Sequence, residues 1–196
     1  MQTCTRHQTA SQQQGSSMVE FALLAPIFMV LLLGVFELVR GLQANNIIVN
    51  ISREGANLVT RTPQDPQDIM TALANTADPL DMGEHGMLMV TVLEGQDDGS
   101  IQATSQFRYN ASTFDPDSQV WDGCSSWAGD GECTGGLPAD LDNDTINDIF
   151  WTGTSGDPLA EGEIAYAFEA FYEFDPVFPI PFNTDEPLEF HSLSLF

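Results

Sequence analysis

An apolar run near the N-terminus dominates the pattern of hydrophobic and polar positions along this chain. Nearly every side chain between residues 21 and 39 is apolar, and Glu37 carries the only charge within that run. A helix of roughly 20 such residues crosses the hydrocarbon of a bilayer with all its backbone groups paired. The pattern therefore predicts a transmembrane span over about residues 18–39, with Glu20 near its start.

Apolar residues continue at helical spacing beyond this span. The positions that share one face are Ala44, Ile47, Ile48, Ile51, Gly55, Leu58 and Val59, whereas asparagine and arginine occupy the opposite face. Such a stripe has to be covered by a folded body. We therefore expect one long helix over residues 16–62, half in the membrane and half packed on a domain. The alternative is a membrane helix followed by a separate short helix, with a break near Gly41.

Residues 63–196 have the pattern of a small α+β body. Asp65 and Pro66 are typical of a helix start, and they predict a short helix that ends near residue 75. Strands are expected over residues 87–93, 101–109, 163–174 and 188–196, and residues 94–100 form a hairpin loop between the first two. In the third strand the apolar positions that alternate with polar ones are Ile164, Tyr166, Phe168 and Phe174. We predict a long helix packed on a small antiparallel sheet, with a long irregular insertion over residues 110–162.

Small residues precede the apolar run instead of following it. A cleavable secretory signal has a shorter apolar core with small residues after it, whereas here Gly15 and Ser16 come before the run. This order resembles a prepilin leader, which would be residues 1–15, with cleavage after Gly15 and a new amino terminus at Ser16. The alternative is an uncleaved signal anchor.

Two further stretches carry a family resemblance. The sequence Val-Glu-Phe-Ala-Leu-Leu-Ala-Pro that begins at Val19, and Ser-Arg-Glu-Gly-Ala at residues 52–56, resemble the TadE-like family. These are pilin-like proteins of the tight-adherence (Flp) pilus system. The resemblance covers residues 14–61 closely, and beyond them it rests on the strand pattern near the C-terminus. It implies a pilin-like fold and a minor pilin or pseudopilin that a prepilin peptidase processes.

The resemblance also implies a role in assembly for Glu20 and the adjoining Phe21. In such filaments the glutamate pairs with the amino terminus of a neighbouring subunit. The pairing is physically sound, because an unpaired carboxylate and an unpaired ammonium are both costly in hydrocarbon. The expected partners are the inner membrane, the peptidase and other pilins. The N-terminus would be cytoplasmic, and the body periplasmic or part of an extracellular pilus.

The charge balance excludes one class of partner. The chain has 5 Lys+Arg against 29 Asp+Glu, for a net charge of −24, and it contains no lysine. Nucleic-acid backbones are bound by clustered lysine and arginine, so nucleic-acid binding is not expected. A body of this charge attracts cations and repels its own copies.

Cysteine placement supports an exported body. Cys124 and Cys133 are close in sequence and have no histidine or further cysteine near them, so they predict a disulfide and not a zinc site. Cys4 is the odd cysteine, and cleavage of the leader would remove it.

A run of alternating aspartates follows the disulfide loop. Positions 1, 3, 5 and 9 of an EF-hand-type loop are matched by Asp140, Asp142, Asp144 and Asp148, and Ile146 would offer the position-7 carbonyl. The residue at position 6 is Thr145 instead of glycine, and position 12 is Trp151 instead of glutamate. Calcium is the cofactor that this run predicts, and an acidic solvated loop is the alternative.

No catalytic signature accompanies these features, since the chain contains no nucleophile elbow, zinc-protease motif or phosphate-binding glycine loop. We therefore do not expect an enzyme. Two function classes remain: a minor pilin or pseudopilin of a tight-adherence pilus that serves in adhesion, and a membrane-anchored periplasmic module that binds calcium or a glycan and never joins a filament.

Overall fold

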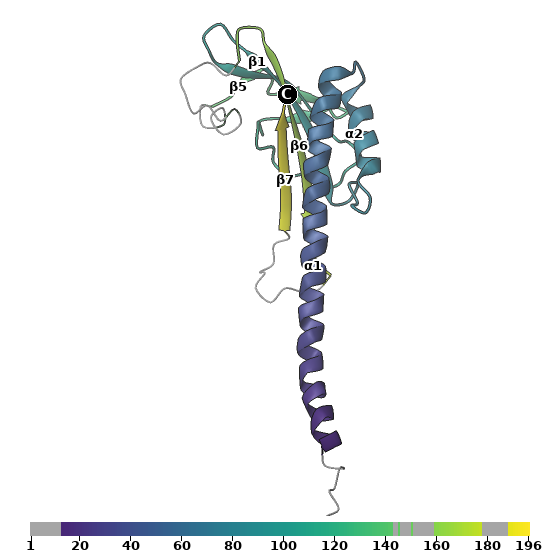
Figure 1. The fold of residues 1–196 in the computed structure, drawn as a ribbon. Coiled ribbons are helices and arrows are strands. Elements are labelled where there is room, and N and C mark those ends of the chain that lie inside the picture. The colour runs from purple at the N-terminus through teal and green to yellow at the C-terminus, as the bar shows by residue number, and fades with distance from the viewer. Residues whose placement is uncertain (1–12, 143–144, 146–149, 151–158, 178–187) are drawn as a thin grey trace, which may run out of the picture.

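A computed structural model describes residues 13–142, 145, 150, 159–177 and 188–196, with the backbone alone for 13–17. Its long helix α1 spans Gln13–Arg61 and is followed by α2, Pro66–Thr76. The strands of the main sheet are β1 (Gly86–Gly95), β2 (Ile101–Arg108), β5 (Ala139–Asp140), β6 (Ile164–Phe174) and β7 (Leu188–Leu195). Two short strands, β3 (Ser126–Trp127) and β4 (Cys133–Gly135), form a separate ribbon. The α+β class predicted from the sequence is confirmed (Figure 1).

Helix α1 is continuous over 49 residues, so the alternative of a break near Gly41 is wrong. At 1.5 Å per residue it is about 74 Å long. The short helix begins as predicted, because the Asp65 carboxylate accepts a hydrogen bond of 2.8 Å from the Gln67 N–H and Pro66 is the first helical residue. This cap satisfies a backbone donor that has no partner within the helix.

The main sheet has the strand order β5-β2-β1-β6-β7, and all its neighbours are antiparallel. Residues 110–162 are less irregular than predicted, because β3, β4 and β5 lie among them and β5 extends the sheet beyond β2. These strands are two or three residues long, and runs that short have no alternating pattern for the sequence to show.

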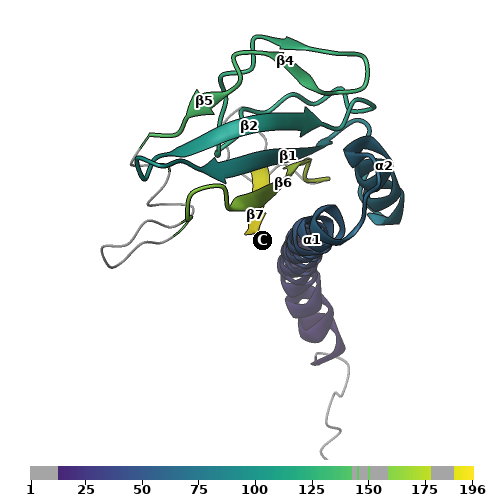
Figure 2. The same ribbon diagram turned by 90° about the horizontal axis from the view of Figure 1, so that it is seen from above.

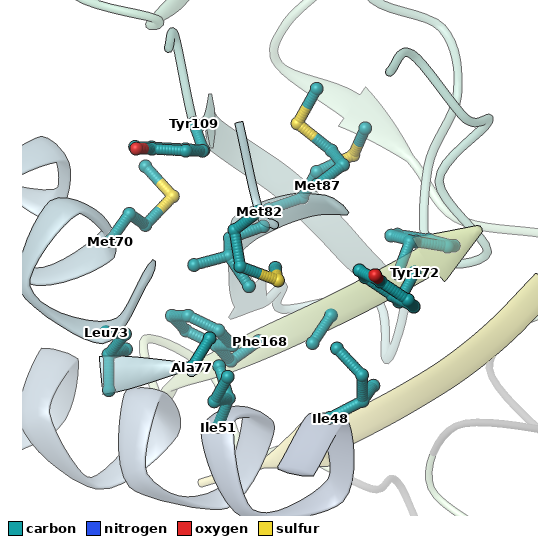
Figure 3. Packing of buried hydrophobic residues seen from close by; sticks show 14 of the residues in the cluster. Ile48, Ile51, Met70, Leu73, Ala77, Met82, Met87, Tyr109, Phe168 and Tyr172 are labelled. Carbon is teal, nitrogen blue, oxygen red and sulfur yellow. The ribbon is translucent and has the colours of Figure 1, made fainter. Parts of the chain in front are cut away.

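Helix α1 packs against β6 and β7, and α2 lies beside α1 near β1 and β2 (Figure 2). The resulting core contains Ile48 and Ile51 from α1, Met70 and Leu73 from α2, and Phe168 from β6 (Figure 3). A second core cluster, which includes Leu93, Ile101, Ala165 and Leu141, lies toward the hairpin end of the sheet.

In strand β6 the predicted alternation of buried apolar and exposed positions is partly wrong. Ile164 was expected to face the core but is 53% exposed, whereas Ala167 and Phe171 on the other face are fully buried. The reason is that β6 is covered on both faces, by α1 on one and by the insertion around Ser118 on the other. A strand buried on both faces shows an almost continuous apolar run instead of a strict alternation.

The closest approach between helix and sheet is at Gly55. A Cβ atom added there would lie within 2.7 Å of three ring atoms of Phe168, which is fully buried in the centre of β6. Ala56, the next residue, is also fully buried. The absence of a side chain at position 55 therefore sets how closely α1 lies on the sheet.

Gly55→Ala is expected to destabilise the body. Overpacking of a filled core costs about 1–3 kcal/mol, and the better helix propensity of alanine returns about 1 kcal/mol at most. Gly34→Ala is the matched control, because nothing lies within 4 Å of its added Cβ on the same helix. Thermal unfolding of the full chain in detergent should show a lower Tm for Gly55→Ala only. Equal Tm values for the two variants would contradict the close approach.

Candidate functional site

The first half of α1 presents apolar side chains around its whole circumference. Between residues 18 and 42 these side chains are 51% to 78% exposed, and they are Met18, Val19, Phe21, Leu23, Leu24, Ile27, Phe28, Met29, Val30, Leu31, Leu32, Val35, Phe36, Leu38, Val39 and Leu42. The described helix contains an 18-residue window of mean hydropathy 2.5, of which 6% is buried. By length and composition this is a candidate membrane span.

The second half of α1 is joined to the sheet by a cluster of three serines. The Ser52 hydroxyl is fully buried and lies 2.8 Å from the Ser192 hydroxyl and 3.0 Å from the Ser194 hydroxyl, both on β7. Ser52 also donates to the Val49 carbonyl. Ser52, Gly55 and Ala56 of the Ser-Arg-Glu-Gly-Ala stretch therefore face the sheet, while Arg53 and Glu54 face outward. This stretch is the docking surface for the body.

A charged pair marks the place where the body first meets the helix. Arg40 lies 3.1 Å from the Glu37 carboxylate, and Glu37 is only 7% exposed. The Arg40 guanidinium also lies over the ring of Phe174, 5.2 Å from its centroid. Burial raises the pKa of the nearby Tyr172, and the positive charge of Arg40 opposes that shift. The Tyr172 phenol therefore stays neutral at physiological pH.

The residues predicted for processing and assembly lie at the far end of the same helix. Gly15 and Ser16 are in the first turns of α1, which begins at Gln13. Glu20 and Phe21 are exposed on the helix surface, and Phe21 is 74% exposed. All four are distant from the body along the helix, as Figure 1 shows for this end of α1.

Comparison with known proteins bears on this helix. Residues 15–57 match the TadE-like protein family. The predicted resemblance is therefore confirmed for this TadE-like segment, which contains both the candidate membrane span and the docking surface. No curated protein and no solved structure matches the chain. The matched family is of a structural, non-enzymatic kind, and the TadE-like segment together with its apolar helix fits a membrane-anchored protein associated with a tight-adherence pilus.

The predicted disulfide is present in the body. Cys124 and Cys133 are joined, and their Cα atoms are 5.9 Å apart. The bond closes the loop that carries β3 and β4, and Arg108 of the main sheet lies over the Trp127 ring at 4.7 Å from its centroid. This contact joins the loop to the main sheet.

Only part of the predicted calcium loop lies among the described residues. Asp140 and Asp142 are described, whereas Asp144, Ile146 and Asp148 lie outside the described residues. Within the described part, no three acidic, histidine or cysteine side chains gather closely enough to hold a metal ion. Asp140 accepts a hydrogen bond of 2.9 Å from Gln102, and Asp142 accepts one of 2.7 Å from the Thr145 N–H.

Asp140 and Asp142 do line a pocket of about 390 Å³. The other aspartates in its wall are Asp117 and Asp122, for which no metal site was predicted. They come from the segment before the disulfide loop, so only the folding of the insertion brings them beside Asp140.

A buried carboxylate in β6 was also missed. Glu169 is fully buried and accepts hydrogen bonds from the Ser118 hydroxyl and the Gln119 N–H, while His191 Nε2 lies 3.3 Å from it. A glutamate in an apolar strand was the available signal, because a buried carboxylate needs such partners. It connects the insertion and β7 to β6.

Proposed function

We propose that this protein is a minor pilin or pseudopilin of a tight-adherence pilus. The observation that carries the proposal is that the two halves of one helix have different surroundings. The first half of the TadE-like segment is apolar and uncovered, and its second half packs on a folded body. Such a helix can enter a membrane and can later pack against the helices of other subunits.

The topology belongs to the same proposal. The leader of residues 1–15 would lie in the cytoplasm, the first half of α1 would cross the inner membrane, and the body would be periplasmic or would be carried outward on a pilus. The disulfide in the body supports this orientation, because such bonds persist in oxidising compartments.

Processing after Gly15 is tested by intact mass spectrometry of the protein isolated from cells that make the pilus. We expect a mature chain that begins at Ser16. Gly15→Leu should keep the leader, because a bulky residue replaces glycine at the scissile bond, whereas Gly34→Leu in the apolar run should still be cut. A wild-type protein that retains Met1 would contradict processing and would favour the uncleaved anchor.

Assembly through Glu20 is tested by Glu20→Ala. The variant should still insert in the membrane, since the change removes a charge from the apolar segment. It should join filaments several-fold less, because the amino terminus of a neighbouring helix would lose its carboxylate partner in hydrocarbon. The measurement is the amount of the protein cross-linked to other pilins in intact cells. Glu54→Ala, an exposed carboxylate on the docked half of α1, is the control. Equal cross-linking of both variants and the wild type would remove the role of Glu20.

We propose calcium binding as a second candidate function, without incorporation in a pilus. The specific observation in its favour is the pocket lined by Asp117, Asp122, Asp140 and Asp142. Oxygen ligands of this kind suit Ca²⁺. Its binding would have to draw the aspartates together, because no three of them lie close enough in the described structure to hold a metal ion.

Calorimetric titration of the full chain with CaCl₂ tests this second function. We expect heat of binding and a higher Tm, because a ligand that binds only the folded state stabilises it. Asp142→Asn should weaken the affinity several-fold, whereas Glu54→Gln on the exposed face of α1 should leave it unchanged. A wild-type protein that gives neither heat nor a change in Tm does not bind calcium.

A further inference from the structure

The lower end of the sheet reaches the segment of α1 that the sequence assigns to the end of the membrane span. Phe174 at the end of β6 pairs with Leu188 at the start of β7. Phe174 lies under the Arg40 guanidinium, and a Cβ atom added at Gly41 would lie 3.7 Å from the Phe190 ring. The body therefore already lies alongside α1 at Arg40 and Gly41.

At this level the helix has two different sides. Glu37 is only 7% exposed, while Phe36, Leu38 and Val39 are 53%, 62% and 55% exposed. These apolar side chains continue the uncovered surface that begins at Met18. A membrane that covers these side chains must therefore extend to the level of the body.

Strand β7 runs along α1 in the same direction, from Phe190 near Gly41 to Ser194 near Ser52 (Figure 1). Leu188 precedes Phe190 by two strand residues, or about 6.6 Å. That distance equals about four residues of helix, which places Leu188 at the level of Glu37. Leu188 is 44% exposed, and Val177, three residues beyond the end of β6, is 61% exposed.

The chemistry at this level suits the boundary between headgroups and acyl chains. The Arg40 guanidinium contacts the faces of Phe36 and Phe174, at 6.0 and 5.2 Å from their centroids, and is paired with Glu37. An arginine at the end of a span extends its charge to the interface while its stem stays among apolar groups. The Phe174 and Phe190 rings pack beside it, with their centroids 5.7 Å apart.

We propose that the β6–β7 end of the body rests on the bilayer that α1 crosses, with Val177 and Leu188 inserted at the headgroup–acyl boundary. This inference rests on the proposed membrane insertion of α1. The lipid is the occupant because Val177 and Leu188 are exposed apolar side chains at the end of the sheet that lies level with the end of the exposed apolar span. The span then leaves hydrocarbon near Phe36: residues 18–35 are about 27 Å long, close to the thickness of the hydrocarbon.

The carboxylates near Val177 and Leu188 determine which lipid headgroup is suitable for the experiment. Glu173, Asp175 and Glu189 lie at the same end of the sheet, and the whole chain has a net charge of −24. An anionic surface would repel this end of the body. Zwitterionic phosphatidylcholine therefore isolates the apolar contact.

The test measures how deep single side chains lie. The full chain is reconstituted in phosphatidylcholine nanodiscs with one copy per disc, in a Cys4→Ser background with the Cys124–Cys133 disulfide intact. A nitroxide label is attached at one position at a time after Leu31→Cys, Val177→Cys, Leu188→Cys or Asp97→Cys. Asp97 is exposed in the β1–β2 hairpin, at the opposite end of the sheet, and is the matched aqueous control.

The readout is the ratio of collision rates with oxygen, which enters lipid, and with a water-soluble nickel chelate. Positions 177 and 188 should give a ratio several-fold higher than position 97, and position 31 should give the highest ratio. If 177 and 188 match 97 while 31 reports lipid, docking is wrong and the span stands. If both reagents rarely reach 177 and 188, protein covers them, and docking is again wrong. If position 31 reports water, the proposed insertion of α1 fails, and this inference fails with it.

Discussion

Apolar side chains line α1 over most of its length, and they are shielded from water in two different ways, by the sheet and by the membrane. The sheet does this for the half around Ile48 and Ile51, through burial against β6 and β7. The large apolar side chains from Met18 to Val39 are left mostly exposed by the described body. Because α1 is one continuous helix, its backbone groups are hydrogen-bonded within the helix both beside the sheet and in lipid. A segment that enters the bilayer must meet this condition. The remaining features of the molecule depend on how the two halves meet.

The helix docks by small residues and hydroxyl groups as much as by apolar contact. Gly55 admits the Phe168 ring to the helix surface, and Ser52 is bonded to two serines of β7. Buried hydroxyl groups are costly unless they are paired, so the serine cluster favours one register of helix against sheet. That register in turn determines which helix residues, Glu37 and Arg40 among them, lie beside the end of the sheet.

The opposite side of the sheet is covered in a different way. The insertion folds back over β6, and the buried Glu169 accepts hydrogen bonds from Ser118 and Gln119. The same fold brings Asp117 and Asp122 beside Asp140 and Asp142. The insertion and the long helix therefore cover opposite faces of β6.

Much of this architecture could be predicted from the sequence, because it depends on local patterns. The length of the apolar run, the stripe of Ile47, Ile48 and Ile51, the Asp65–Pro66 helix start and the pairing of Cys124 with Cys133 all involve residues that are close in the chain. Four strands were located because alternation and turn residues mark them. The role of the Gly55 stretch could be recognised only as a resemblance, since its partners Phe168, Ser192 and Ser194 are more than a hundred residues away.

Tertiary structure alone decided the features that join distant segments. Burial of both faces of β6 placed Ile164 outside and Phe171 inside, against the expected alternation. The short strands β3, β4 and β5 exist because of their neighbours and have no periodic pattern of their own. The body also contacts the helix as early as Arg40 and Gly41, directly after the span that hydropathy assigned to lipid. Hydropathy measures how strongly each side chain favours an apolar environment over water. The tertiary structure determines whether protein or lipid provides that environment.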